Sequence, residues 1–334
     1  MARRERVPPL QTAKFLLFDV PNRLFMHCDS KTCSTCLAEH SHASVSLVVP
    51  VKNGGERWQQ VIRSIQSQNI HLKHILIIDS GSSDLSDKHA REAGFHVVTI
   101  DSRSFDHGGT RQMAVDMLAD SDIIAFLTQD AILKTPDTLG SLVCYLCKHP
   151  NAGVAYGRQV PRPTARAIER HARLFNYPPG ITLEKKIEHA ERLGIKTAFS
   201  SDSLAVYRRD RLMAAGGFPR QCLTGEDAIV AARILIHGGS VLYVHDAEVE
   251  HSHDLTVIQE WRRYFAIGRL HTQESAILSP FKEVSKEGRK FVASEMRYLF
   301  THAPLTIPEA LFRTGVKYLA YRAGQLTTKR LAAQ

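Results

Sequence analysis

The stretch Ile123-Ile-Ala-Phe-Leu-Thr-Gln-Asp130-Ala131 is an apolar run that stops at a polar pair and one carboxylate. A second run of the same design, Ile75-Leu-Ile-Ile-Asp79, precedes it along the chain. Short apolar runs bounded by turn residues predict buried strands. Because ligands of parallel sheets gather where the strands end, the two carboxylates mark a candidate binding site.

Strands and helices alternate through the first half of the chain. This alternation predicts an α/β fold with a parallel, doubly wound sheet that carries helices on both faces. We expect strands at 44–51, 74–79, 96–100 and 123–128, and helices at 56–68, 84–93 and 110–119. The second half is less regular, with strands expected at 154–159, 204–207 and 240–244, a helix at 226–237, and helices from Leu255 onward.

The composition is that of a globular protein, with 334 residues, 43% hydrophobic and 23% charged. The charged N-terminus has no apolar segment after it, so we expect no signal peptide and a cytosolic location. From Leu255 to Gln334, 13 Lys and Arg against 6 Glu and no Asp leave a net charge of +7. Such an excess suits anionic lipid or phosphorylated substrates. Nucleic acid is not expected, because neither a DNA-reading zinc-finger spacing nor an RNA-binding aromatic strand motif is present.

The N-terminal 43 residues hold a dense cysteine cluster. Cys28, Cys33 and Cys36 lie close together, flanked by histidines. Three thiolates and an imidazole would satisfy a small structural zinc site. The alternative is an irregular arm with chance cysteines.

Asp130 is the best candidate for a metal ligand. Mg²⁺ or Mn²⁺ between two phosphates needs only one or two protein carboxylates. His251 or His253 could add a ligand, and because the two alternate on a strand-like stretch, only one is expected to face the site. The alternative reading is a pair of surface histidines.

Two further motifs carry charge next to predicted helices. In Phe105-Asp-His-Gly-Gly-Thr-Arg111, the glycines would leave a helix N-terminus open to an anion, and Arg111 could add a donor for diphosphate; a plain loop capped by Thr110 is the alternative. Glu226 and Asp227 begin a predicted helix, where carboxylates also favour the dipole. As a catalytic pair, Asp227 would deprotonate an acceptor hydroxyl and Glu226 would orient the acceptor.

Five short motifs, taken in their order along the chain, resemble those of family 2 glycosyltransferases and, within that family, of the bacterial rhamnosyltransferase branch. The resemblance covers roughly residues 44–255. It rests on Pro50-Val-Lys-Asn53, Ile78-Asp79-Ser-Gly-Ser-Ser-Asp84, Phe105-Asp-His-Gly-Gly-Thr-Arg111, Phe126-Leu-Thr-Gln-Asp130-Ala and Gly225-Glu226-Asp227.

The resemblance implies a GT-A fold, a Rossmann-like, mostly parallel sheet flanked by helices. It also implies a nucleotide-diphospho-sugar donor, inversion at the anomeric carbon and a divalent metal. Asp130 would bind the metal and Asp227 would be the base. The donor would be held by Pro50, Asn53, Asp79, Ser80, His107, Gly109, Arg111 and Gln129. One departure stands out: the family's metal motif is Asp-x-Asp, and its first position here is Thr128, which raises the importance of His251 or His253.

Three regions follow: an N-terminal extension (1–43), a catalytic domain (44–254) and a basic, amphipathic helical region (255–334). The last would suit an anionic membrane surface on the inner face of the cytoplasmic membrane. An acceptor carried on a polyprenyl diphosphate would fit it, with L-rhamnose transferred from dTDP-L-rhamnose in surface polysaccharide synthesis. The alternatives are another donor sugar, a nucleotidyltransferase, or a protein that binds nucleotide sugars without catalysis.

Overall fold

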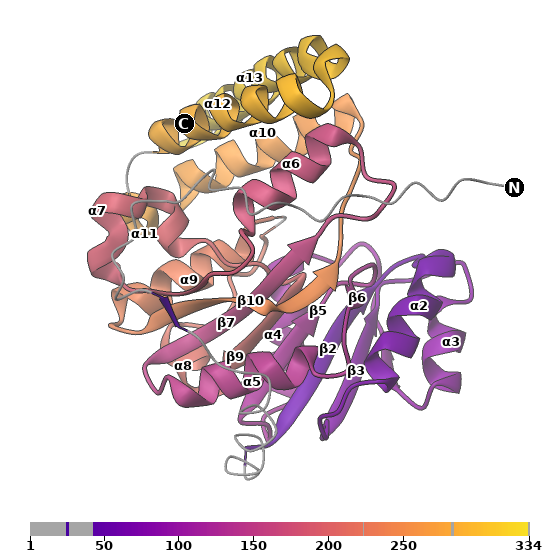
Figure 1. The fold of residues 1–334 in the computed structure, drawn as a ribbon. Helices are drawn as coiled ribbons and strands as arrows, with labels where there is room; N and C mark the ends of the chain where they lie inside the picture. Colours follow the sequence, from indigo (N-terminus) through magenta and orange to yellow (C-terminus); the bar gives the residue numbers. More distant parts are fainter. Residues whose placement is uncertain (1–24, 27–42, 223, 282–283, 333–334) are drawn as a thin grey trace, which may run out of the picture.

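The computed structural model describes residues 25–26, 43–222, 224–281 and 284–332 (Figure 1). Cys28, Cys33 and Cys36 lie outside these ranges, and so does the predicted zinc site. In the part of the chain that is described, no helix is both long and apolar enough to cross a membrane.

A single mixed sheet forms the centre of the molecule, with the strand order β1-β8-β10-β7-β9-β5-β2-β3-β4. Pairing is parallel between β4, β3, β2 and β5 and between β7 and β10, whereas β9 is antiparallel to both β5 and β7. Every strand between β4 and β10 in this order, except β9, therefore runs in the same direction. The bounds are β1 Phe25–Met26, β2 Val45–Val51, β3 His74–Asp79, β4 His96–Thr99, β5 Ile123–Leu127, β6 Ile132–Leu133, β7 Ala152–Val160, β8 Thr182–Lys185, β9 Leu204–Arg208 and β10 Ser240–Glu250.

Helices cover both faces of the sheet and enclose two apolar cores. One core lies between the sheet and α2 and α5, and Trp58 is fully buried in it. The other lies between the sheet and α4, α8 and α9, and includes Phe126 and Tyr207. The bounds are α2 Gly55–Gln66, α3 Ser86–Glu92, α4 His107–Met117, α5 Thr138–Lys148, α6 Ala167–Asn176, α7 Ala190–Leu193, α8 Arg209–Ala214 and α9 Glu226–Ile236.

Three of the four C-terminal helices, α10, α12 and α13, lie together at the top of Figure 1 over α6, whereas the short α11 lies lower, beside α7. The bounds are α10 Val257–Gln273, α11 Ser275–Leu278, α12 Val284–His302 and α13 Ile307–Ala332. Helices α10 and α13 cross closely at Gly324. A Cβ added to this glycine would lie only 2.1 Å from the carbonyl oxygen of Phe265. Beside this crossing, Glu260 of α10 forms ion pairs with Arg313 at 3.0 Å and with Lys317 at 3.2 Å. The two basic side chains are thus turned toward α10.

The sheet and its flanking helices confirm the predicted α/β fold, and most element bounds agree within two residues. Two differences matter for the site. Helix α4 begins at His107, three residues before the predicted start, because Asp106 caps it by accepting from the N–H of Gly109 at 2.7 Å. Strand β10 continues to Glu250 through an irregularity between Val244 and Glu248.

The close approach of α10 and α13 at Gly324 can be tested by substitution of this glycine. Gly324→Ala should lower the free energy of unfolding by about 1–3 kcal/mol, because the added methyl group has no room against α10. Gly315→Ala is the control, since a Cβ there meets nothing within 4 Å, and an exposed helical Gly→Ala change stabilises by up to about 1 kcal/mol. Urea unfolding of both variants measures the difference. Equal stability of the two variants would show that the helices do not cross at Gly324.

Candidate active site

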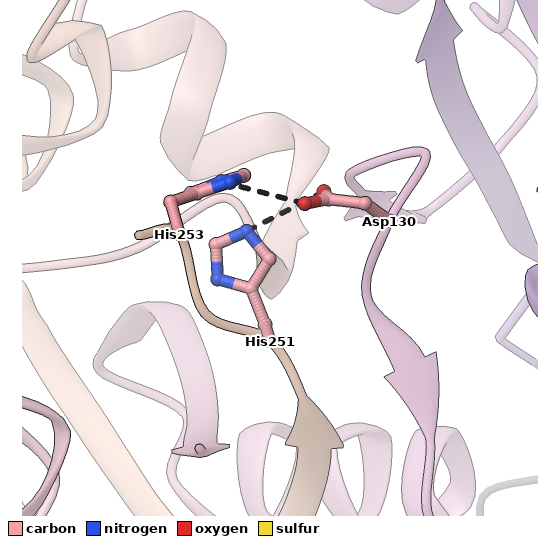
Figure 2. A group of neighbouring side chains, drawn as sticks. All are labelled: Asp130, His251 and His253. Atoms are coloured by element: carbon pink, nitrogen blue, oxygen red, sulfur yellow. Dashed lines mark ion pairs between the residues drawn. The ribbon is translucent and has the colours of Figure 1, made fainter. Parts of the chain in front are cut away.

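Asp130 and two histidines meet at the carboxyl ends of β5 and β10 (Figure 2). The Asp130 carboxylate lies 3.4 Å from Nε2 of His251 and 3.4 Å from Nε2 of His253. The candidate ligand atoms of the three residues all lie within 4.8 Å of one another. One carboxylate oxygen and two imidazole nitrogens are a donor set that fits a divalent transition metal.

Hydrogen bonds from β7 orient His251. The side-chain oxygen of Gln159 lies 2.7 Å from the Arg173 guanidinium and 2.9 Å from Nδ1 of His251. Arg173 can only donate, so the atom that it meets is the amide oxygen, and Nδ1 of His251 must donate to it as well. The lone pair of Nε2 is thereby left toward Asp130. An outer partner of this kind fixes the tautomer of a metal-binding histidine.

The prediction that only one of the two histidines faces the site is wrong. Strand β10 ends at Glu250, so the alternation of side chains along a strand does not extend to His251 and His253. The backbone N–H of His253 donates to Glu169 at 3.0 Å. The imidazole ring of His253 packs edge to face against that of His251, with 4.6 Å between the ring centroids. Both rings therefore reach the Asp130 carboxylate.

The protonation of the three groups suits metal binding. Burial lowers the pKa of His251 and lowers that of His253 to about 4, so both imidazoles are neutral near pH 7. Burial alone would raise the pKa of Asp130, but the polar groups around it, Thr128 among them, outweigh burial and hold that pKa below its usual value. Metal ligands must be deprotonated, and these groups already are.

A second cluster places two carboxylates around one buried guanidinium. Arg111, predicted to approach a diphosphate, is 4% exposed. Its Nε lies 2.8 Å from Asp202 and its Nη1 lies 2.8 Å from Glu226. The Asp202 carboxylate also accepts from the Tyr207 hydroxyl at 2.6 Å. Arg111 is thus already paired with carboxylates of the protein, and its predicted contact with a diphosphate stays a prediction.

Asp227 lies beside this cluster and is held by the backbone. Its carboxylate accepts from the N–H groups of Ala228 at 2.8 Å and Asp202 at 3.4 Å. Burial, with the negative charges of Glu226 and Asp202, raises the pKa of Asp227 to about 8. Burial also raises the pKa of Asp202, to about 6. A carboxyl whose pKa is close to the working pH is suited to proton transfer.

The helix end that was predicted to face an anion is closed. The carboxylate of Asp106 accepts from Gly109, and the N–H of Gly108 donates to the carbonyl of Cys222 at 3.4 Å. A Cβ at Gly108 would lie 1.8 Å from the carbonyl oxygen of Pro219. The glycines therefore allow close packing against the 219–222 segment and leave no open helix N-terminus.

The predicted nucleotide-binding residues gather at the ends of β2, β3 and β5, where several of them are hydrogen-bonded to neighbouring residues of the protein. Asp79 accepts from the N–H groups of Gly81 and Ser82, and Asn53 accepts from the N–H of Ser83 at 2.8 Å. Gln129 accepts from the N–H of Lys52 at 2.6 Å and donates to its carbonyl at 3.0 Å. Ser80 donates to the Val51 carbonyl, next to Pro50.

A cavity of about 720 Å³ contains both charged clusters. The residues that line it include His107, Arg111, Asp130, Glu226, Asp227, His251 and His253, but not Pro50, Asn53, Asp79, Ser80, Gly109 or Gln129. Asp202, Gln159 and Arg173 also line it and were missed by sequence reasoning. Asp202 follows Ser200-Ser201 and precedes β9, and nothing local marks it as different from an ordinary loop carboxylate.

Comparisons with known proteins define the class. A family model described as glycosyl transferase family 2 matches residues 46–214. The O-antigen chain rhamnosyltransferase RfbN of Salmonella typhimurium is 39% identical over 84% of this chain and 89% of its own length. The O-antigen chain rhamnosyltransferase WbaN of Salmonella anatum is 38% identical over 84% and 89%.

Solved structures share the fold at low sequence identity. A mannosyltransferase from Pyrobaculum calidifontis, in complex with GDP-mannose and Mn²⁺, has a TM-score of 0.57, with 15% identity over 85% of this chain and 86% of its own. The glucosyl-3-phosphoglycerate synthase of Mycobacterium tuberculosis has a TM-score of 0.54, with 17% identity over 77% and 86%.

The fold, with a cavity where its strands end, is that of GT-A glycosyltransferases. This chain belongs to glycosyltransferase family 2, and the predicted resemblance is confirmed.

Proposed function

We propose that this enzyme transfers L-rhamnose from dTDP-L-rhamnose to a hydroxyl of a lipid-linked glycan during O-antigen synthesis. The observation that carries the proposal is one cavity holding both a metal-ligand set, Asp130 with His251 and His253, and the carboxylate of Asp227. The sugar and the pathway are supported by the two relatives, which are both named O-antigen chain rhamnosyltransferases.

In this proposal Asp130, His251 and His253 hold a divalent ion. When bound, the ion neutralises charge that develops on the nucleoside diphosphate as it leaves. Two imidazole donors favour Mn²⁺ over Mg²⁺, which prefers oxygen ligands. The second histidine would thereby replace the first carboxylate of the family's Asp-x-Asp motif, because Thr128 occupies that position in this chain. The nucleotide part of the donor would lie at the neighbouring strand ends, against Pro50, Asn53, Asp79, Ser80 and Gln129.

Asp227 would take the proton of the acceptor hydroxyl as that oxygen attacks the anomeric carbon. The new glycosidic bond forms as the bond to the diphosphate breaks, so the anomeric configuration inverts. Glu226 is held by Arg111 at 2.8 Å, and this ion pair fixes the first turn of α9, which carries Asp227. His107 lies beside Arg111, and burial lowers its pKa, so it is a neutral hydrogen-bonding group at the cavity wall.

Donor turnover tests the proposal directly. Purified enzyme with Mn²⁺ should release dTDP from dTDP-L-rhamnose, slowly by hydrolysis and faster with acceptor, and EDTA should abolish the release. Asp130→Ala should abolish Mn²⁺ binding in calorimetry, and Gln159→Leu should weaken it about 10- to 100-fold by freeing the His251 ring. Release from another nucleotide sugar would overturn the proposed donor, and no binding of any nucleotide sugar would overturn the proposed activity.

The raised pKa of Asp227 predicts the pH dependence. The base acts only as a carboxylate, so kcat/KM should rise with pH through a pKa near 8. Asp202→Asn removes a neighbouring negative charge and should move this rise to lower pH, by roughly one unit. Asp210→Asn, an exposed change on α8, is the control and should leave the profile in place. An unmoved profile in Asp202→Asn would contradict the assignment of Asp227.

The C-terminal helices support attachment to an anionic membrane surface. Apolar side chains on α13 recur on one face and remain exposed, and basic side chains stand beside them. Leu305, which precedes α13, is 94% exposed, and Phe312 is 61% exposed. The exposed large apolar side chains of α12, α13 and their connection are Phe300, Leu305, Leu311, Phe312, Tyr318, Leu319 and Leu326, and Arg322, Lys329 and Arg330 of α13 are exposed as well. Such a combination binds the headgroup region of a bilayer.

Vesicle sedimentation tests this attachment. The double change Phe312→Ser and Leu319→Ser should reduce binding to vesicles that contain phosphatidylglycerol at least tenfold, and donor hydrolysis should not change. Leu85→Ser, at an exposed apolar residue beside α3, is the control. Binding that is unaffected by the double change would place the membrane contact elsewhere.

A further inference from the structure

A second groove, of about 610 Å³, opens beside the reaction cavity. One wall is a face of α10 and the other is the segment 219–222. Thr224, Arg262, Ala266 and Leu270 line both the groove and the reaction cavity. The two spaces therefore adjoin each other, and the groove lies at the edge of the cavity that holds Asp227.

Three arginines give the groove its charge. Arg220, Arg262 and Arg269 line it, and Glu274 is the one acidic residue among its described lining. Arg220 and Arg262 are exposed, and Arg269 is half-buried. Within the described residues, none of the three guanidinium groups forms a hydrogen bond or an ion pair. In the reaction cavity, by contrast, Arg111 and Arg173 are both paired with carboxylates of the protein.

An apolar stripe runs along the same helix. Ile258, Trp261 and Phe265 follow one another at helical spacing, and Trp261 and Phe265 line the groove. Ile258 is 66% exposed and Trp261 is 41% exposed, although both are large apolar side chains. Unpaired guanidinium groups beside an exposed apolar stripe match a ligand that is anionic at one point and hydrocarbon next to it.

We infer that this groove binds the acceptor through a diphosphate attached to an isoprenoid chain. The inference rests on the proposed function and assigns its acceptor end. Arg262 and Arg269, with Arg220 opposite, would hold the diphosphate oxygens, and the hydrocarbon would lie along Trp261 and Ile258. The glycan would extend from the groove into the cavity, where its hydroxyl meets Asp227.

The donor diphosphate is a poorer occupant of this groove. The candidate metal ligands Asp130, His251 and His253 line the reaction cavity and not the groove. A donor held at the metal would therefore leave the groove arginines unused. An acceptor diphosphate would supply the second anionic group that these arginines can bind.

Farnesyl diphosphate is a suitable probe, in EDTA so that it cannot bind through a metal at Asp130. The full-length enzyme should bind it in calorimetry and should bind farnesol at least tenfold more weakly. The double variant Arg262→Gln and Arg269→Gln should lose at least tenfold in affinity. Arg289→Gln with Arg297→Gln makes the same change of charge on exposed positions of α12 and should bind as the wild type does.

Several results would overturn the inference. They are the absence of farnesyl diphosphate binding to the wild type, equal affinity for farnesol, or equal losses in the two double variants. Binding of phosphatidylglycerol vesicles that depends on Arg262 and Arg269, without binding of farnesyl diphosphate, would assign the groove to bilayer phosphate instead. Hydrolysis of dTDP-L-rhamnose needs no acceptor, so it reports separately on the proposed function.

Discussion

The parallel direction of β5, β7 and β10 is the constraint on which the active site depends. These strands run the same way on either side of the antiparallel β9, so their carboxyl ends and the start of β9 share one edge of the sheet. Asp130 follows β5, His251 follows β10, Gln159 lies near the end of β7 and Asp202 precedes β9. Four segments that are distant in sequence thereby supply one cavity.

The second constraint is the buried charge of Arg111. A buried cation is tolerated only when it is paired, and removal of a partner from such a network is costly. Arg111 joins α4 to α9 through Glu226 and to the start of β9 through Asp202. The same negative charges raise the pKa of Asp227. One ion-pair network thus holds the helix that presents the proposed base and adjusts the acidity of that base.

The fold and part of the site could be predicted because their signals are local. Apolar runs marked the strands, and the polar residue after each run marked its carboxyl end, as for Asp79 and Asp130. Asp202, Gln159 and Arg173 could not be predicted in this way, since their importance comes from the strand order. The start of α4 was misplaced although Asp106, three residues before Gly109, is an ordinary capping residue. The two histidines were misjudged because strand-like alternation was expected at 251–253, whereas β10 ends at Glu250.

The central claim is that Asp130, His251 and His253 together hold one divalent ion beside Asp227. Crystals of the enzyme grown with Mn²⁺ and dTDP would test it, with anomalous diffraction measured at the manganese absorption edge. The account predicts one strong peak, bound by the Asp130 carboxylate and by Nε2 of both histidines, with the diphosphate on its open side. A peak at Asp202, Glu226 and Asp227, or a diphosphate bound by Arg111 with no ion at Asp130, would contradict it.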